Sequence, residues 1–236
     1  SNGKSTMKMP YWVRRTHKWI GLIIGVQALL WMISGVYMTT ISLDIIHGDH
    51  LAHVAHEPLG RTGERLPVAE LMSRYPGLQS FKLKKLLGQE VFEIRQGDKP
   101  ALVNARSGEL MSPLKRETIV AIAKDIYQGE AEVSDVSWIT QAPQEVAKRP
   151  VPMWAVRFDE RADTTLYFSP QTGELLARRH TLWRVFDFLW MLHIMDYGQR
   201  TDVNNTLLRV ASGTGLVFAL SGAWLVFFSF RRRSAP

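Results

Sequence analysis

The chain has 236 residues and a formal net charge of +7, and it contains no cysteine. A chain of this length has room for one or two domains. The lack of cysteine excludes disulfides, thiolate catalysis, iron–sulfur clusters and thiolate-ligated haem.

The excess positive charge is confined to the two ends of the chain. Residues 44–209 hold 21 basic and 22 acidic side chains and are nearly neutral. Five basic residues precede Asp44 and three follow Arg209, and no acidic residue accompanies them. Two short basic ends do not make a basic surface, so we expect no nucleic-acid partner.

Two uncharged apolar runs lie just inside these basic ends, at residues 19–41 and 210–230. A bilayer core of ~30 Å takes about 20 helical residues, so each run can span it. Because basic residues flank spans on the cytoplasmic side, residues 1–18 and 231–236 are predicted to be cytoplasmic. We therefore expect transmembrane helices at 19–41 and 207–230, with the large middle segment in the periplasm of a bacterial inner-membrane protein.

The middle segment opens with HGDHLAHVAH, residues 47–56, inside a histidine-rich exit loop predicted over residues 42–65. Its histidines recur every third residue, and on an α-helix three such steps drift to the opposite face. Four histidines on one ion would therefore need a loop or a 3₁₀ path. Three interpretations stay open, in this order: a polar exit in which His50 alone is functional, a transient iron site, and a zinc site. The iron site would use His47, Asp49, His53 and His56.

Residues 66–115 and 116–180 carry one pattern twice. A helical stretch at 67–75 precedes strands at 81–87, 90–96, 101–105 and 110–114, and a helix at 117–127 precedes strands at 152–159, 164–170 and 175–179. The clearest repeat is NARSGEL (104–110) with SPQTGEL (169–175). The pattern predicts two α+β units, each a helix on an antiparallel sheet, with Gly108 and Gly173 at turn positions that need φ > 0.

Residues 181–200, TLWRVFDFLWMLHIMDYGQR, are aromatic-rich and predict an interfacial amphipathic helix. His193 lies near its end, among apolar and aromatic residues. In the spans, the GxxxG of residues 21–25 and the Ser-Gly pairs of ISGVYM (33–38) and LSGAWL (220–225) predict close helix packing.

Taken in order, these motifs resemble the PepSY-associated transmembrane family. RRTHKWIGLIIG (14–25) is similar to its opening, HGDHL (47–51) to its short His-Leu motif, and FDFLWMLHIMDYG (186–198) to its later Leu-His segment. The stretch from Pro67 to Leu110 is similar to its PepSY module, and the resemblance covers Arg14 to Phe230. It implies a membrane protein with an α-helical transmembrane pair plus a periplasmic α+β domain of two PepSY-like repeats.

The resemblance also implies a function. Larger members of the family are haem b inner-membrane reductases of ferric siderophores, and small two-span members include the VciB-type proteins linked to ferric iron reduction. We therefore expect a ferric reductase that supports iron uptake, with one or two haem b groups per dimer and ferric iron or a ferric chelate as substrate. No nucleotide-binding glycine loop stands out, so an external cytoplasmic or quinol electron donor is required.

His17, His193 and His50 are the candidates for haem axial ligands. With metal–imidazole bonds of ~2 Å, two axial nitrogens lie about 4 Å apart. His17 and His50 are 33 residues apart, which is roughly 50 Å along one helix, so they cannot share an iron within one chain. We therefore expect a homodimer with a four-helix membrane core, in which His17 meets the partner subunit's His17. His193 would pair with the partner subunit's His193 or with His50.

Two other functions remain open. The chain could be a membrane-tethered PepSY binding or inhibitory module without redox chemistry, since PepSY modules also occur as inhibitory propeptides of peptidases. It could instead be a periplasmic metal-binding or metal-delivery protein that uses the histidine cluster. No HExxH motif or Ser-His-Asp arrangement stands out, so no catalytic side chain is predicted.

Overall fold

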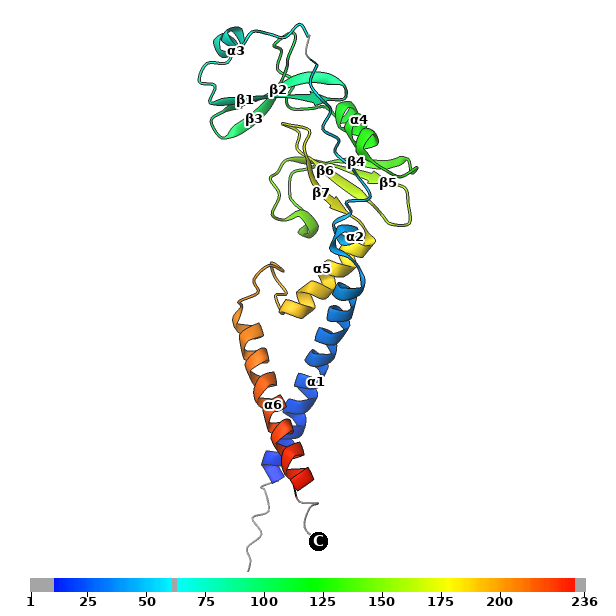
Figure 1. The fold of residues 1–236 in the computed structure, drawn as a ribbon, viewed down its shortest axis with the longest axis vertical. Coiled ribbons are helices and arrows are strands. Elements are labelled where there is room, and N and C mark those ends of the chain that lie inside the picture. Colours follow the sequence, from blue (N-terminus) through cyan, green and yellow to red (C-terminus); the bar gives the residue numbers. More distant parts are fainter. Residues whose placement is uncertain (1–10, 61–62, 232–236) are drawn as a thin grey trace, which may run out of the picture. The chain divides into compact units, whose positions relative to one another are not determined.

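The protein divides into two compact units, seen in a computed structural model that describes residues 11–60 and 63–231 (Figure 1). Side chains are described for residues 15, 18–60 and 63–223. The first, which we call the helical unit, comprises Ser1–Ile41 and Val185–Pro236. The second, the sheet unit, comprises Ser42–Arg184.

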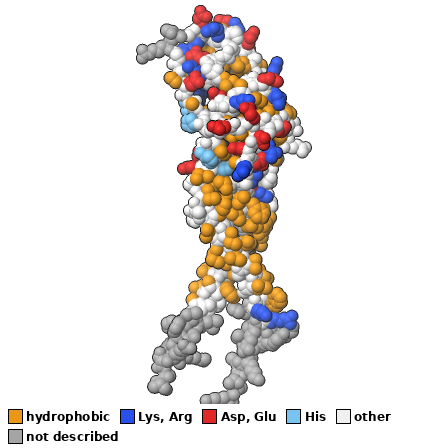
Figure 2. Space-filling view, turned by 90° about the vertical axis from the view of Figure 1, so that its right-hand side faces the viewer, with side chains coloured by type: hydrophobic (Ala, Val, Ile, Leu, Met, Phe, Trp, Pro, Cys, Tyr) orange, Lys and Arg blue, Asp and Glu red, His pale blue; other side chains and the backbone are white. Residues whose placement is uncertain are grey.

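Two long helices, α1 (Tyr11–Thr40) and α6 (Thr206–Arg231), form most of the helical unit. Their stretches Lys18–Thr40 and Thr206–Ala223 are long and apolar enough to cross a bilayer. Large apolar side chains such as Ile23 and Val217 are 67% and 68% exposed, which core helices of a soluble protein would not allow. Figure 2 shows hydrophobic side chains covering these helices, with charged side chains gathered over the sheet unit. A surface this apolar requires lipid around it.

The GxxxG of α1 is used for packing at one of its two glycines. A Cβ placed at Gly21 would lie 3.1 Å from the Phe218 ring of α6, so a larger residue would have to displace this ring. At Gly25 a Cβ would meet nothing within 4 Å. Helix packing therefore explains Gly21 and leaves Gly25 facing open space.

Helix α5 (Thr181–Ile194) is shorter than the predicted helix at 181–200. It ends before Asp196 because that carboxylate accepts hydrogen bonds from the backbone N–H groups of Gly198, Gln199, Thr201 and Asp202. A short acidic side chain that satisfies backbone donors in this way favours a turn over a continuing helix. Met195 adopts a φ of 53°, which also stops the helix.

The first half of the sheet unit is a helix and a three-stranded antiparallel sheet. Helix α3 (Val68–Arg74) precedes β1 (Ser80–Leu86), β2 (Gln89–Gln96) and β3 (Lys99–Asn104), in the spatial order β1-β2-β3. Two-residue turns join the strands, at 87–88 and 97–98. The predicted strand at 110–114 is not formed: Leu110 makes only an isolated bridge with Val103, and Pro113 has no N–H to extend the ladder.

The second half repeats this plan with one more strand. Helix α4 (Arg116–Ile126) precedes β4 (Val133–Ile139), β5 (Met153–Phe158), β6 (Thr165–Phe168) and β7 (Leu175–Arg179), in that spatial order. A 3₁₀ turn, η1 (Gln144–Val146), lies between β4 and β5. Strand β4 was not predicted, because a register shift between Val133 and Asp135 interrupts the alternation by which a strand is recognised.

The two repeats share a turn whose hydrogen bonds are the same. Gly108 N–H donates to Asn104 O and Gly173 N–H donates to Ser169 O, both at 2.9 Å. The φ angles of these glycines are 74° and 67°, so the predicted positive φ is confirmed at both. The repeated sequence therefore marks a repeated backbone.

One hydrophobic core joins the repeats into a single unit. Helix α4 buries Ile119, Ile122, Ala123 and Ile126 against the second sheet, and Val91 and Leu102 of the first sheet belong to the same cluster. A smaller cluster lies under α3. The exit segment, which begins with α2 (Leu43–His47), joins this core through Ala52, which bridges Tyr127.

We expect Gly173→Val to destabilise the sheet unit more than Gly97→Val does. Both positions have positive φ, which costs a branched side chain about 1–2 kcal/mol. A Cβ at Gly173 would also lie 2.9 Å from Ile122 Cδ1, which adds roughly 1–3 kcal/mol of overpacking, whereas at Gly97 it meets nothing. Urea unfolding of the full chain in mild detergent measures the difference. Equal stabilities of the two variants would contradict this account.

Candidate functional site

His193 on α5 is held by Ser34 of α1, with 2.7 Å between its Nδ1 and the serine Oγ. Ser34 is fully buried, and its Oγ also lies 2.8 Å from the Leu30 carbonyl oxygen in its own helix. A hydroxyl has one hydrogen, and a helical serine commonly donates it to the carbonyl four residues back. We therefore assign Nδ1–H as the donor to Ser34 Oγ. This tautomer leaves Nε2 with a free lone pair.

The last carbonyl groups of α5 are capped by side chains from other elements. A helix leaves its last carbonyls without intrahelical donors. Here three consecutive ones are satisfied from other elements of the helical unit: Leu192 by Gln27 Nε2 at 3.3 Å, His193 by Trp31 Nε1 at 2.8 Å and Ile194 by Asn205 Nδ2 at 2.8 Å. The imidazole is thus fixed both by its ring and by its backbone.

One aromatic ring, that of Trp190, lies alongside this imidazole. The Trp190 ring lies parallel to it, with centroids 6.3 Å apart and an interplanar angle of 7°. Trp190 Nε1 donates to the Arg200 carbonyl oxygen, and the Arg200 guanidinium forms an ion pair with Asp187. These contacts tie the loop after α5 back onto the helix and hold Trp190 in place.

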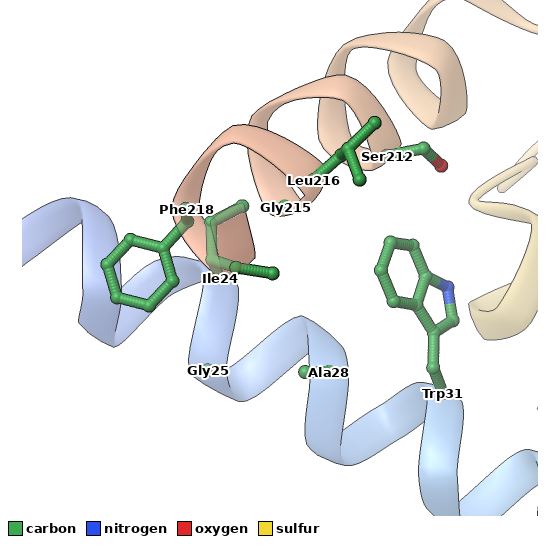
Figure 3. A pocket seen from close by; sticks show the side chains of 9 residues that line it. Ile24, Gly25, Ala28, Trp31, Ser212, Gly215, Leu216 and Phe218 are labelled. Carbon is green, nitrogen blue, oxygen red and sulfur yellow. The ribbon is translucent and has the colours of Figure 1, made fainter. Parts of the chain in front are cut away.

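A slot of about 440 Å³ lies between α1 and α6 (Figure 3). This volume is within the range of small-molecule sites, roughly 300–1,000 Å³. Its lining is apolar except for the Trp31 indole nitrogen and the Ser212 hydroxyl, and it consists of Ile24, Gly25, Ala28, Trp31, Ser212, Gly215, Leu216, Phe218 and Ala219. Trp31 lines the slot and also caps the His193 carbonyl, so one residue joins the two features.

In the sheet unit, two residues of the histidine-rich segment contact β7 and the residue that follows it. His50 lies edge-on to His180, with centroids 5.9 Å apart, and Asp49 pairs with Arg178 at 3.3 Å. His180 is 2% exposed, and its Nε2 donates to the Ile46 carbonyl oxygen at 3.0 Å. Burial lowers the pKa of His180, so its ring is neutral at pH 7.

The remaining histidines of the segment, His47, His53 and His56, are exposed. Among the described residues no group of three or more His, Asp and Glu side chains could hold a metal ion. The structure therefore does not gather His47, Asp49, His53 and His56 around one ion, and the transient iron site stays a prediction.

The other two axial candidates lie outside the described side chains of the helical unit. His50 belongs to the sheet unit, whereas His193 belongs to the helical unit. His17 falls within α1, but its side chain lies outside the described residues. Their pairings therefore stay predictions.

Sequence reasoning missed Gln27, Trp31, Ser34 and His180. The first three recur at i, i+4 and i+7 in an otherwise apolar helix, which places them on one face. That spacing is a signal for a polar contact inside the helical unit and could have found them. His180 had no comparable signal, because its burial depends on α2, which precedes it by more than 130 residues.

These features define a membrane protein in which two apolar helices accompany an α+β domain of two repeats. The chain belongs to the family described as the PepSY-associated TM region, whose pattern matches residues 14–235. No curated protein and no solved structure matches the chain significantly.

We expect Asp196→Ala to lower the thermal unfolding midpoint, because four backbone N–H groups lose their acceptor. These hydrogen bonds hold the pKa of Asp196 below its ordinary value of 3.8. The carboxylate therefore stabilises the fold fully above pH 4, and its contribution is lost as the pH falls through the lower folded pKa.

The difference in melting midpoint between wild type and variant, measured from pH 3 to pH 7, should accordingly shrink as the pH falls below 3.8. Asp125→Ala, which changes an exposed carboxylate of α4, is the matched control and should melt like the wild type. A gap between wild type and Asp196→Ala that stays constant down to pH 3 would contradict the assignment.

Proposed function

We propose that this protein is a haem b-dependent ferric reductase of the bacterial inner membrane. It passes electrons across the membrane to ferric iron or ferric chelates in the periplasm and so supports iron uptake. Both termini are cytoplasmic and the sheet unit is periplasmic. The observation that carries the proposal is the His193 imidazole, oriented through Nδ1 by the buried Ser34 hydroxyl in the helical unit.

The residues around His193 suit a haem. Metal-bound histidines commonly donate their second ring N–H to a neighbour, which fixes the tautomer and raises ligand basicity. Ser34 supplies that acceptor, and Trp190 supplies a flat apolar neighbour. When bound, haem b supplies a one-electron ferric/ferrous couple, tuned by its axial ligands and its surroundings.

The other residues of the site position this imidazole. Gln27, Trp31 and Asn205 each donate a hydrogen bond to one of the last three α5 carbonyls. The Asp187–Arg200 pair holds the loop that fixes Trp190. The side chain of His193 therefore has a set orientation before any ligand binds.

A homodimer completes the site in this proposal. Among the described side chains of the helical unit, His193 is the only imidazole, so a second imidazole to hold the haem would come from elsewhere. A two-fold dimer supplies it as the partner subunit's His193, with His50 as the other choice. His17 and the partner subunit's His17 would form a second site on the cytoplasmic side.

The exposed histidines are proposed to meet the substrate. Ferric iron prefers oxygen ligands, whereas ferrous iron accepts imidazole more readily. His47, His53 and His56 are exposed and not fixed around an ion, so they can hold iron only loosely. Loose binding favours release of the reduced product.

We expect His193→Ala to remove the spectrum of a low-spin haem with two imidazole ligands. Ser34→Ala should keep the ligand but loosen it, lowering haem affinity roughly 10- to 100-fold, as losses of such partners do. Reduced-minus-oxidised spectra and haem titration of the purified protein measure both effects. Ser221→Ala is the matched control, since Ser221 Oγ donates to Phe218 O at 2.7 Å within its own helix. A wild-type spectrum in His193→Ala would show that another residue is the ligand.

Dithionite-reduced protein should be reoxidised by ferric citrate. Replacing His47, His53 and His56 together with alanine should slow this reoxidation and leave the haem spectrum intact, because these side chains are exposed and lie outside the helical unit. Stopped-flow absorbance at the Soret band gives both readings. If ferric chelates do not oxidise the reduced protein at all, the reductase assignment is wrong.

A binding module without redox chemistry is the second candidate function. Strands β1 and β4 are edge strands of their sheets, and a free edge can accept an extended peptide. Trp138 on β4 is 43% exposed and lies against Trp154. Membranes from haem-replete cells that lack a Soret band from this protein would favour this candidate.

A further inference from the structure

We propose that the slot between α1 and α6 binds an isoprenoid quinol, which is the electron donor. This inference rests on the proposed reductase function and goes further by naming the donor and its site. Four observations support it: the position of the slot within the membrane-spanning stretches, its shape, the unpaired Ser212 hydroxyl and the contact between Trp31 and His193.

The depth of the slot selects a lipid-soluble occupant. All of its lining residues belong to the stretches Lys18–Thr40 and Thr206–Ala223, which are apolar enough to cross the bilayer. Water-soluble donors such as nicotinamides or flavins carry charged phosphates that would be costly to bury there. A molecule that reaches this site therefore comes from the hydrocarbon layer.

The shape of the slot suits a flat ring. A Cβ at Gly25 would meet nothing within 4 Å, and at Gly215 its nearest neighbour would be Ile24 Cγ2 at 3.9 Å. These glycines therefore do not serve close helix packing, unlike Gly21. Figure 3 shows Phe218 toward one end of the slot and Trp31 toward the other, so aromatic rings flank the space between them.

One polar group in the slot is left without a partner. Ser34 and Ser221 donate to carbonyls of their own helices. Ser212 is an exposed residue of α6 at the edge of the slot, and in the part of the chain that the structure describes no hydrogen bond involves its hydroxyl. A polar group in hydrocarbon without a partner is unfavourable. A quinol hydroxyl or a quinone carbonyl at the edge of a flat ring is the partner it lacks.

Other occupants fit less well. A haem would need an axial ligand, and the lining residues include no imidazole or thioether. A helix of a second copy is about 10 Å across and could insert only a side chain. A lipid acyl chain would fill the space but leave Ser212 unpaired.

The slot is linked to His193 through Trp31. The indole ring lines the slot, and its Nε1 donates to the His193 carbonyl oxygen at 2.8 Å. A donor in the slot is therefore one residue away from the proposed electron-accepting site. Oxidation of one quinol to quinone releases two electrons and two protons. The electrons reduce two ferric ions to ferrous ions, and the protons leave to water.

The test uses the full chain in lipid nanodiscs with decyl-ubiquinone and decyl-ubiquinol as probes. Gly25→Leu places a side chain in the slot, where its Cβ would meet nothing within 4 Å. We expect at least tenfold weaker binding of decyl-ubiquinone, measured by quenching of tryptophan fluorescence. Ser212→Ala should weaken binding about fivefold, the usual effect of one hydrogen bond. Gly213→Leu is the matched control, because Gly213 neighbours the slot in sequence, does not line it and has nothing within 4 Å. It should bind like the wild type.

A second measurement separates this inference from the proposed function. Decyl-ubiquinol should reduce the haem of the wild type and of Gly213→Leu, as followed at the Soret band, but not the haem of Gly25→Leu. Dithionite should reduce the haem of all three proteins. If dithionite-reduced protein is reoxidised by ferric citrate but quinol never reduces it, the quinol site is wrong and the reductase stands. If the quinone binds as expected but ferric citrate does not oxidise the protein, the site stands and the reductase is wrong.

Two further outcomes would overturn the quinol site. Equal quinone binding by Gly25→Leu and Gly213→Leu would show that the slot is not where the quinone binds. Conversion of Gly25→Leu to a monomer with quinone binding intact would make the slot a contact between subunits.

Discussion

The helical unit depends on how helix α5 ends. A helix that stops among apolar helices has carbonyl groups that water does not reach, and each unmet carbonyl is costly. Three consecutive carbonyls, those of Leu192, His193 and Ile194, are met by side-chain N–H groups of Gln27, Trp31 and Asn205. These contacts decide which part of α1 lies beside α5. They also set the orientation of His193, because its ring then meets the Ser34 hydroxyl.

The same contacts connect the slot between α1 and α6 with the His193 imidazole. Trp31 is shared between them, as a wall of the slot and as a donor to the His193 backbone. The proposed reductase needs a donor site, a redox centre and an acceptor surface. We propose that the slot is the donor site, that His193 holds the redox centre, and that the exposed histidines form the acceptor surface.

The sheet unit supplies shape and a surface in this scheme. Its two repeats share one core, so that Val91 and Leu102 of the first sheet pack with α4 of the second. The histidine-rich segment is attached to this unit through Ala52 and Tyr127, and Asp49 is paired with Arg178. A fixed backbone with exposed imidazoles suits brief contact with iron better than a closed site does.

The sequence by itself determined what depends on neighbouring residues. Hydropathy determined both spans, and the repeated RSGEL and QTGEL stretches determined two turns with positive φ at Gly108 and Gly173. It could not determine where α5 ends or what His193 contacts. The end of α5 depends on backbone donors captured by Asp196, and Ser34 and His193 are 159 residues apart. Local patterns record which face of a helix is apolar, but only the packing of α1 against α5 decides which polar groups on those faces meet.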